Sequence, residues 1–285
     1  MVLLAAGIAL AAAALVASQK FGSRRILPVV ALLSVVALGL FDYFLGVAPL
    51  VGLAAGYQLD RKQPYGWVIA GAALPGGLMA LQLMTILPEE LPDELLHAEL
   101  RAQQEQMESL GLLVNEEIGS LQEKMVRAGY PLLPGVVFFF VLLQAVLAYR
   151  VGHAVSAAAK VSLPPPVALR LWRPWSQLIW VLVSGLALSL IGEGWVGNLG
   201  SNLILVMGLL YTCQGLAVGR FFARRVGLAT MLEVAIYAVL TLSFVGLLLL
   251  PLTGLLDTWF DWRRLEAVDD EGGTTDLPHD SDLEN

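Results

Sequence analysis

Four polar residues stand beside long apolar runs and could together hold a small molecule. Asp42 lies near the end of one run, Glu193 follows another, and Asn198 and Asn202 share one helical face of the next. Small-molecule sites usually combine apolar walls with a few placed polar groups. The sequence therefore offers a candidate ligand pocket. The alternative is structural, with Asn198 as a helix cap and Glu193 in solvent.

Other kinds of chemistry have no matching set of residues. His97, His153 and His279 have no partner at metal-ligand spacing, and Cys213 lies alone inside an apolar run. The sequence contains neither a phosphate-binding P-loop nor a Gly-x-Ser-x-Gly motif. We therefore expect no catalytic residues, no enzyme activity, no bound metal and no cofactor.

Small residues recur at four-residue spacing in three of the apolar runs. They are Ala5, Ala9, Ala13 and Ala17 in the first run, the pair Gly52 and Gly56, and the pair Gly215 and Gly219. Small residues one turn apart let two helix backbones approach closely in a membrane. Two interpretations stay open: packing within the chain, or contact with a membrane-protein partner or a second copy.

The composition places these residues in a lipid bilayer. Hydrophobic residues are 57% of the chain and charged residues 14%, with a mean hydropathy of +0.72, whereas soluble domains carry about 25% charged residues. Runs near the ~20 residues that cross a bilayer cover 2–18, 26–45, 65–87, 131–149, 176–192, 199–219 and 228–251, with a shorter one at 47–59. The sequence predicts an all-α, polytopic membrane protein with about eight transmembrane helices.

An acidic stretch divides the chain. Residues 1–88 form an N-terminal transmembrane part, and 131–264 form a C-terminal transmembrane block. Between them, 89–130 is acidic and predicts two amphipathic helices outside the membrane, the first from Asp93 to near Gly111 and the second from Asn115. The acidic tail, 265–285, has no Lys or Arg and is expected to be disordered.

Basic residues predict the orientation. Loops 19–25, 60–64, 150–173 and 220–227 hold 12 of the 17 Lys and Arg residues, and such loops face the cytoplasm. The acidic segment, Glu193 and the tail then face outward. If 47–59 does not cross, the side of the N-terminus reverses. The first run lacks a basic segment before it, which favours a retained helix over a signal peptide. No basic surface suits nucleic acid.

The C-terminal block resembles a known family. The matching stretches are NLGSN at 198–202, QGLAVGRFF at 214–222 and LLDTWFDWRR at 255–264. Over roughly 130–264 the chain is similar to the YybS-like family of predicted bacterial membrane proteins. That resemblance implies a multi-pass protein of the bacterial inner (cytoplasmic) membrane, and it supplies no activity.

A more distant resemblance is to the S components of energy-coupling-factor transporters. Those proteins bind vitamins from outside and dock a transport module through an Ala-xxx-Ala face on their first helix, a spacing that Ala5, Ala9, Ala13 and Ala17 match. This chain departs from them in its predicted eight spans rather than six, its acidic segment and its outward tail. Two hypotheses follow: a transport-related, small-molecule-binding membrane protein, or a non-catalytic membrane scaffold that holds partners.

Overall fold

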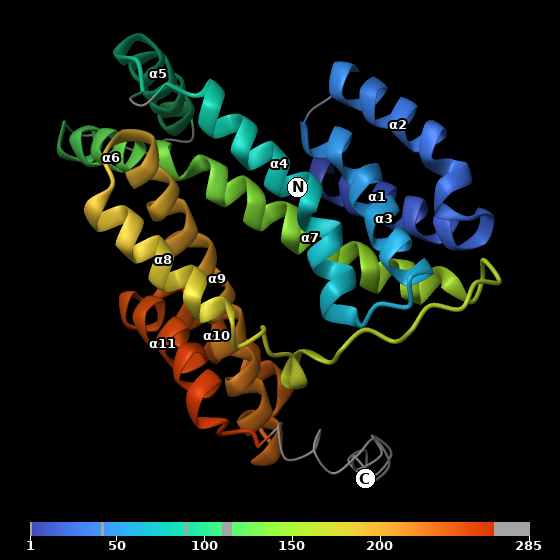
Figure 1. The fold of residues 1–285 in the computed structure, drawn as a ribbon. Coiled ribbons are helices and arrows are strands. Elements are labelled where there is room, and N and C mark those ends of the chain that lie inside the picture. Colours follow the sequence, from blue (N-terminus) through green and yellow to red (C-terminus); the bar gives the residue numbers. More distant parts are fainter. Residues whose placement is uncertain (1, 41–42, 89–90, 110–115, 265–285) are drawn as a thin grey trace. The chain divides into compact units, whose positions relative to one another are not determined.

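The computed structural model describes residues 2–40, 43–88, 91–109 and 116–264. Within these ranges the regular elements are helices and no strand occurs (Figure 1), so the all-α prediction is confirmed. Asp42 and the tail at 265–285 lie outside the described residues. The chain divides into two compact units: unit 1 is Met1–Pro166 with Gln177–Met207, and unit 2 is Val167–Ser176 with Gly208–Asn285.

Five helices build the centre of unit 1. They are α1 (Val2–Phe21), α2 (Ser23–Leu40), α3 (Tyr43–Asp60), α4 (Tyr65–Ile86) and α7 (Leu133–Ser156). Helix α3 packs against α1, α2 and α4, while α7 packs against α1 and α4 (Figure 1). The core shared by α1, α3, α4 and α7 contains the buried Leu15, Val51, Val68, Val141 and Tyr149. Apolar side chains therefore fill the space between the helices.

Small residues let these helices approach closely. A Cβ on Gly52 of α3 would collide with the backbone carbonyl of Ala11 in α1, and one on Gly76 of α4 would meet the Val141 side chain of α7 at 2.6 Å. Close backbone approach through small residues is the usual way in which membrane helices pack. The α1–α3 and α4–α7 contacts therefore depend on the absence of side chains at these positions.

The basic loops of unit 1 meet at one end of its helices. Gln19 Nε2, at the end of α1, donates a hydrogen bond to Asp60 Oδ1 at the end of α3 (3.0 Å). Tyr149, near the end of α7, stacks edge-on with Tyr65 at the start of α4 and donates its hydroxyl to the Pro164 carbonyl (2.9 Å). Loops 19–25 and 60–64 and the first half of 150–173 thus lie together, as loops on one side of a membrane would.

The acidic segment contains the two predicted helices, α5 (Asp93–Ser109) and α6 (Glu116–Gly129). Arg127 of α6 donates to Asp93 Oδ1 at 2.7 Å and to Glu123 Oε1 at 3.1 Å. The hydrogen bond from Arg127 holds the pKa of Asp93 below its ordinary value. Leu121 and Met125 on α6 are exposed, so part of its apolar stripe remains uncovered.

The last four helices are α8 (Leu178–Ile191), α9 (Gly194–Arg225), α10 (Thr230–Leu242) and α11 (Phe244–Phe260). The expectation of one continuous span over 228–251 is wrong, because α10 and α11 are bent by 105° at Ser243. Ser243 adopts an extended backbone and its hydroxyl accepts the Gly246 N–H at 3.0 Å. Ser243 therefore caps a new helix, a role that apolar run length does not reveal.

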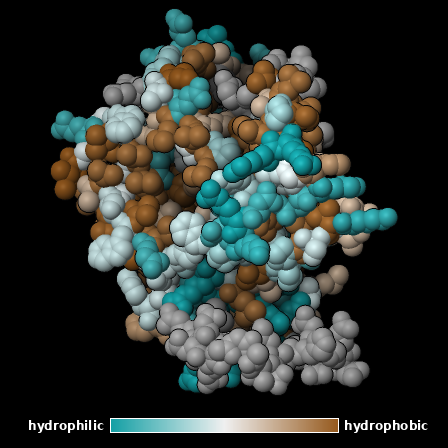
Figure 2. All heavy atoms as spheres, turned by 45° about the vertical axis from the view of Figure 1, so that its right-hand side comes forward, coloured by the Kyte–Doolittle hydropathy of each residue, from teal (hydrophilic) through white to brown (hydrophobic). Residues whose placement is uncertain are grey.

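Several helices suit a bilayer by length and composition. Among the described residues, four helices are long and apolar enough to cross: Leu3–Phe21, Tyr65–Ile86, Gly119–Ser156 and Gly194–Arg225, or five spans if the bent pair counts as one. About eight spans therefore stays a prediction. Many large apolar side chains are exposed, and Figure 2 shows hydrophobic atoms over broad areas with hydrophilic ones gathered in patches. Such large exposed apolar areas are typical of surfaces that meet lipid or a partner.

Candidate functional site

Asn202 joins two helices of unit 1 through hydrogen bonds from both ends of its side-chain amide. It is buried in α9, and its Oδ1 accepts the backbone N–H of Gly135 in α7 at 2.6 Å. Its Nδ2 donates to the carbonyls of Pro131 and Asn198, both at 2.8 Å. Because these bonds occupy both amide hydrogens and the oxygen, Asn202 positions the helices around it, and little of its side chain remains for a ligand.

Asn198 lies one turn earlier and lines a cavity of about 350 Å³. The other walls come from the end of α4, the short helical turn Tyr130–Leu132 before α7, and the start of α9. Tyr130 and Trp195 supply aromatic surfaces, and Thr85 supplies a hydroxyl. Within the described chain, the side-chain amide of Asn198 makes no hydrogen bond, so its donor and acceptor remain available.

The start of α9 places Trp195 and Asn198 on the same wall. Helix α8 ends at Ile191, and the chain turns through Gly192 and Glu193 into α9 at Gly194, which has a positive φ of 53°. Positive φ is readily adopted by glycine, so the turn can be tight. Trp195 and Asn198, three residues apart in the new helix, then share a face.

The predicted polar set is thus only partly assembled among the described residues. Asn198 and Asn202 are adjacent, but only Asn198 lines the cavity. Glu193 is exposed in the turn before α9. Asp42 lies outside the described residues. Tyr130, Trp195 and Thr85 were missed by sequence reasoning, since they sit at helix ends where aromatic and polar residues are common in any membrane protein.

Chemically, the cavity presents neutral groups. Among the described residues, its lining contains no Asp, Glu, Lys, Arg or His. An amide, a phenol and a hydroxyl can donate and accept hydrogen bonds, while the two aromatic rings can stack on a flat molecule. This arrangement suits binding and orientation of a small, uncharged or weakly polar ring compound.

The small-residue faces divide into covered and open ones. Gly52 and Gly56 face Ala11 and Ser18 of α1, Gly215 faces the Leu250 backbone of α11, and Gly219 faces the Tyr237 ring of α10. These glycines therefore serve contacts within the chain. By contrast, the alanine face of α1 is largely open: Ala5, Ala9 and Ala13 are exposed, and Ala17 is half-buried.

Unit 2 contains a fully buried ion pair that sequence reasoning missed. Arg263 Nη2 lies 2.7 Å from Asp257 Oδ2, and neither side chain is exposed. Arg263 Nη1 also donates to the carbonyls of Arg170 (2.8 Å) and Trp172 (3.1 Å), and Gln214 Nε2 of α9 donates to Asp257 Oδ2 at 3.0 Å. The pair thus ties α11, α9 and the segment before α8 together.

The spacing of this pair explains why it was not foreseen. Residues six apart do not share a helix face, so Asp257 and Arg263 cannot pair within a continuous helix. Asp261 ends α11 in the left-handed conformation (φ 39°, ψ 53°), which turns the chain back toward α11. Gln214 of α9 joins α11 through its hydrogen bond to Asp257.

A second buried carboxylate lies near the start of α10. Glu233 is 1% exposed and faces Arg220 at 3.4 Å and Arg224 at 3.8 Å, both on α9. The two arginines therefore compensate one buried charge, beyond the topological role that the sequence suggested for them. The contact fixes the start of α10 against the end of α9 within unit 2.

Comparison with known proteins gives one family. The family described as "Predicted membrane protein (DUF2232)" matches residues 1–258 of the chain. The chain belongs to this family. As a DUF2232 protein it is a predicted membrane protein, for which a lipid bilayer is a plausible environment; the description assigns no activity and leaves the YybS-like and S-component resemblances as predictions. Searches among curated proteins and solved structures found no match.

Proposed function

We propose that this DUF2232 protein is a small-molecule-binding subunit of a membrane transport system. The observation that carries the proposal is the Asn198 side-chain amide, which has no hydrogen-bond partner among the described residues and lines a cavity of about 350 Å³ beside Tyr130 and Trp195. A pocket with apolar walls and a few unpaired polar groups is the usual form of a ligand site. Asn202 supports it by holding the backbone at Asn198 and Pro131.

The position of the cavity supports uptake from outside. It lies at the end of α4 around Thr85, whereas the basic loops meet at the start of α4 around Tyr65. If the basic loops face the cytoplasm, the cavity opens on the opposite side of the bacterial inner membrane. An outward-facing site is what the S-component resemblance implies for vitamin capture.

The open alanine face of α1 supports a docking partner. Ala5, Ala9 and Ala13 are exposed, although α1 buries its opposite side against α3 and α7. A row of small residues allows another helix to approach closely. In this proposal the transport module contacts α1 there. The same face favours the second candidate function, a non-catalytic scaffold that binds partners and takes no small molecule.

A ligand screen distinguishes the two functions. The purified protein would be heated with water-soluble vitamins and related neutral ring compounds, and the unfolding temperature would be measured. A ligand present at 100 times its Kd stabilises a protein by ~2.7 kcal/mol. Asn198→Leu should abolish the response to any hit. Ser201→Ala should retain it, because Ser201 lies on the same helix but does not line the cavity.

Two results would decide against ligand binding. One is the absence of any stabilising compound with a protein shown to be folded. The other is an equal response in Asn198→Leu and wild type, which would place the compound elsewhere. Loss of co-purifying proteins on Ala9→Leu with Ala13→Leu, together with either result, would favour the scaffold.

A further inference from the structure

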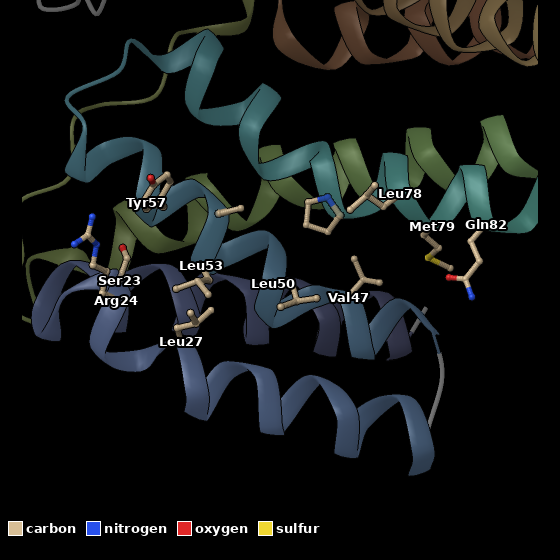
Figure 3. Close-up of a pocket in the computed structure, with 12 residues that line it drawn as sticks. Ser23, Arg24, Leu27, Val47, Leu50, Leu53, Tyr57, Leu78, Met79 and Gln82 are labelled. Carbon is tan, nitrogen blue, oxygen red and sulfur yellow. The ribbon is translucent and has the colours of Figure 1, made fainter.

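An apolar groove runs between α2, α3 and α4 in unit 1 (Figure 3). Its volume is about 600 Å³, and its walls are formed mainly by Leu27 of α2, Val47, Leu50 and Leu53 of α3, and Leu78 of α4. Leu27 and Leu78 are 52% and 70% exposed, so the groove is continuous with the apolar outer surface. It shares no residue with the Asn198 cavity.

One end of the groove is polar and basic. Figure 3 shows Arg24, Ser23 and Tyr57 gathered there, with Gln82 at the other end. Arg24 makes no ion pair or hydrogen bond within the described chain. Ser23 is 3% exposed, and its hydroxyl has no hydrogen-bond partner among the described residues. A buried hydroxyl without a partner costs free energy, so a group that accepts a hydrogen bond from Ser23 would stabilise this end of the groove.

We propose that the groove binds an anionic phospholipid, with the phosphate at Arg24 and Ser23 and one acyl chain along the leucines. Arg24 supplies the positive charge, the Ser23 hydroxyl supplies a hydrogen bond, and the apolar walls cover the chain. The proposal does not rest on the ligand site at Asn198, since the two sites are lined by different residues.

The dimensions of the groove favour a lipid. From Tyr57 to Val47 it follows ten residues of α3, about 15 Å of helix. This length equals roughly half of the ~30 Å hydrocarbon layer, and hence the depth of one leaflet. The polar end also lies with the basic loops, on the side where anionic lipids attract Lys and Arg and where pockets between membrane helices bind their headgroups.

Lipid binding can be measured directly by native mass spectrometry. The protein would be delipidated in detergent and titrated with phosphatidylglycerol, phosphatidylcholine or inorganic phosphate. We expect one tight phosphatidylglycerol, weaker phosphatidylcholine and no retained free phosphate. Arg24→Gln should weaken the binding of phosphatidylglycerol about fivefold, the factor that corresponds to ~1 kcal/mol per basic residue at an anionic surface. Arg25→Gln, which alters a neighbour outside the groove, should leave binding unchanged.

A second pair of variants tests the acyl-chain site. Ala54→Phe would fill the groove and should remove the tight lipid, whereas Leu32→Phe on the exposed side of α2 should retain it. Equal loss from Arg24→Gln and Arg25→Gln would overturn the headgroup assignment. Retention of the lipid by a folded Ala54→Phe variant would overturn the assignment of the acyl chain to the groove. Retention of inorganic phosphate as tight as that of the lipid would show a free-anion site and overturn the lipid assignment.

Discussion

Removing one partner of the buried ion pair in unit 2 should strongly destabilise that unit. Arg263→Met deletes two N–H contacts to Asp257 Oδ2, at 2.7 and 3.2 Å, and leaves Asp257 at 0% exposure with one neutral donor, Gln214. An uncompensated buried charge costs about 3–5 kcal/mol. The carbonyls of Arg170 and Trp172 also lose their donor, but their segment can open toward water. We therefore expect a loss of ~3–5 kcal/mol.

Two further variants separate the effect of the buried charge from the effect of losing an arginine side chain. Adding Asp257→Asn to Arg263→Met removes the buried charge while keeping an acceptor for Gln214. The double variant should therefore recover most of the lost stability and remain ~1–2 kcal/mol below wild type because of the lost hydrogen bonds. Arg264→Met, at an exposed neighbour, should stay within about 0.5 kcal/mol of wild type. The assay is reversible unfolding in detergent with increasing dodecyl sulfate. Equal effects of Arg263→Met and Arg264→Met would refute the buried pair.

Three other predictions follow from particular contacts. Gly215→Ala should cost ~1–3 kcal/mol in the same unfolding assay because its Cβ meets the Leu250 backbone, whereas Gly208→Ala, with open space around it, should be neutral or stabilising; equal effects would contradict the packing. Arg263 bonds to the carbonyls of Arg170 and Trp172 in the basic loop 150–173, so we expect residue 264 on the same side as that loop, contrary to the outward side predicted from the loop charges. In a Cys213→Ala background, cysteine at Arg264 should therefore match cysteine at Ser162 in resisting an impermeant thiol reagent in intact cells. A reactive site at 264 with a protected one at 162 would support the outward side instead. The pKa of Asp93, which pairs with Arg127 across α5 and α6, is lowered in the folded state, so the pair stabilises this contact above the ordinary pKa of 3.8 and loses that contribution as the pH falls through the lower folded-state pKa. Distances between spin labels on α5 and α6 should therefore lengthen only in strong acid. Unchanged distances in strong acid would contradict the pairing.

The sequence was informative about helices and less so about their ends. Run length and composition predict an all-α membrane protein because a bilayer requires long apolar helices. The two helices of the acidic segment follow from their amphipathic pattern. The break at Ser243 was missed, since one serine in a long apolar run is easily read as part of a span. Its effect depends on local capping, which run length does not report.

For the site, sequence spacing identified Asn198 and Asn202 as neighbours but could not assign their roles. The side-chain amide of Asn202 is fully hydrogen-bonded because of Gly135 and Pro131, about 70 positions earlier. The Asp257–Arg263 pair likewise depends on a left-handed turn at Asp261. The Asn202 contacts arise from tertiary packing between distant segments, and the ion pair arises from one residue's backbone conformation, so neither follows from the spacing of residues in the sequence.

An experimental structure of the protein purified from its native membrane tests the central claim most directly. We expect density for a small molecule in the cavity between α4 and α9, within hydrogen-bond distance of the Asn198 amide and against Tyr130 or Trp195. The same density should be absent from Asn198→Leu. A cavity filled by the protein's own side chains, with Asn198 paired inside the chain, would contradict the proposed binding function.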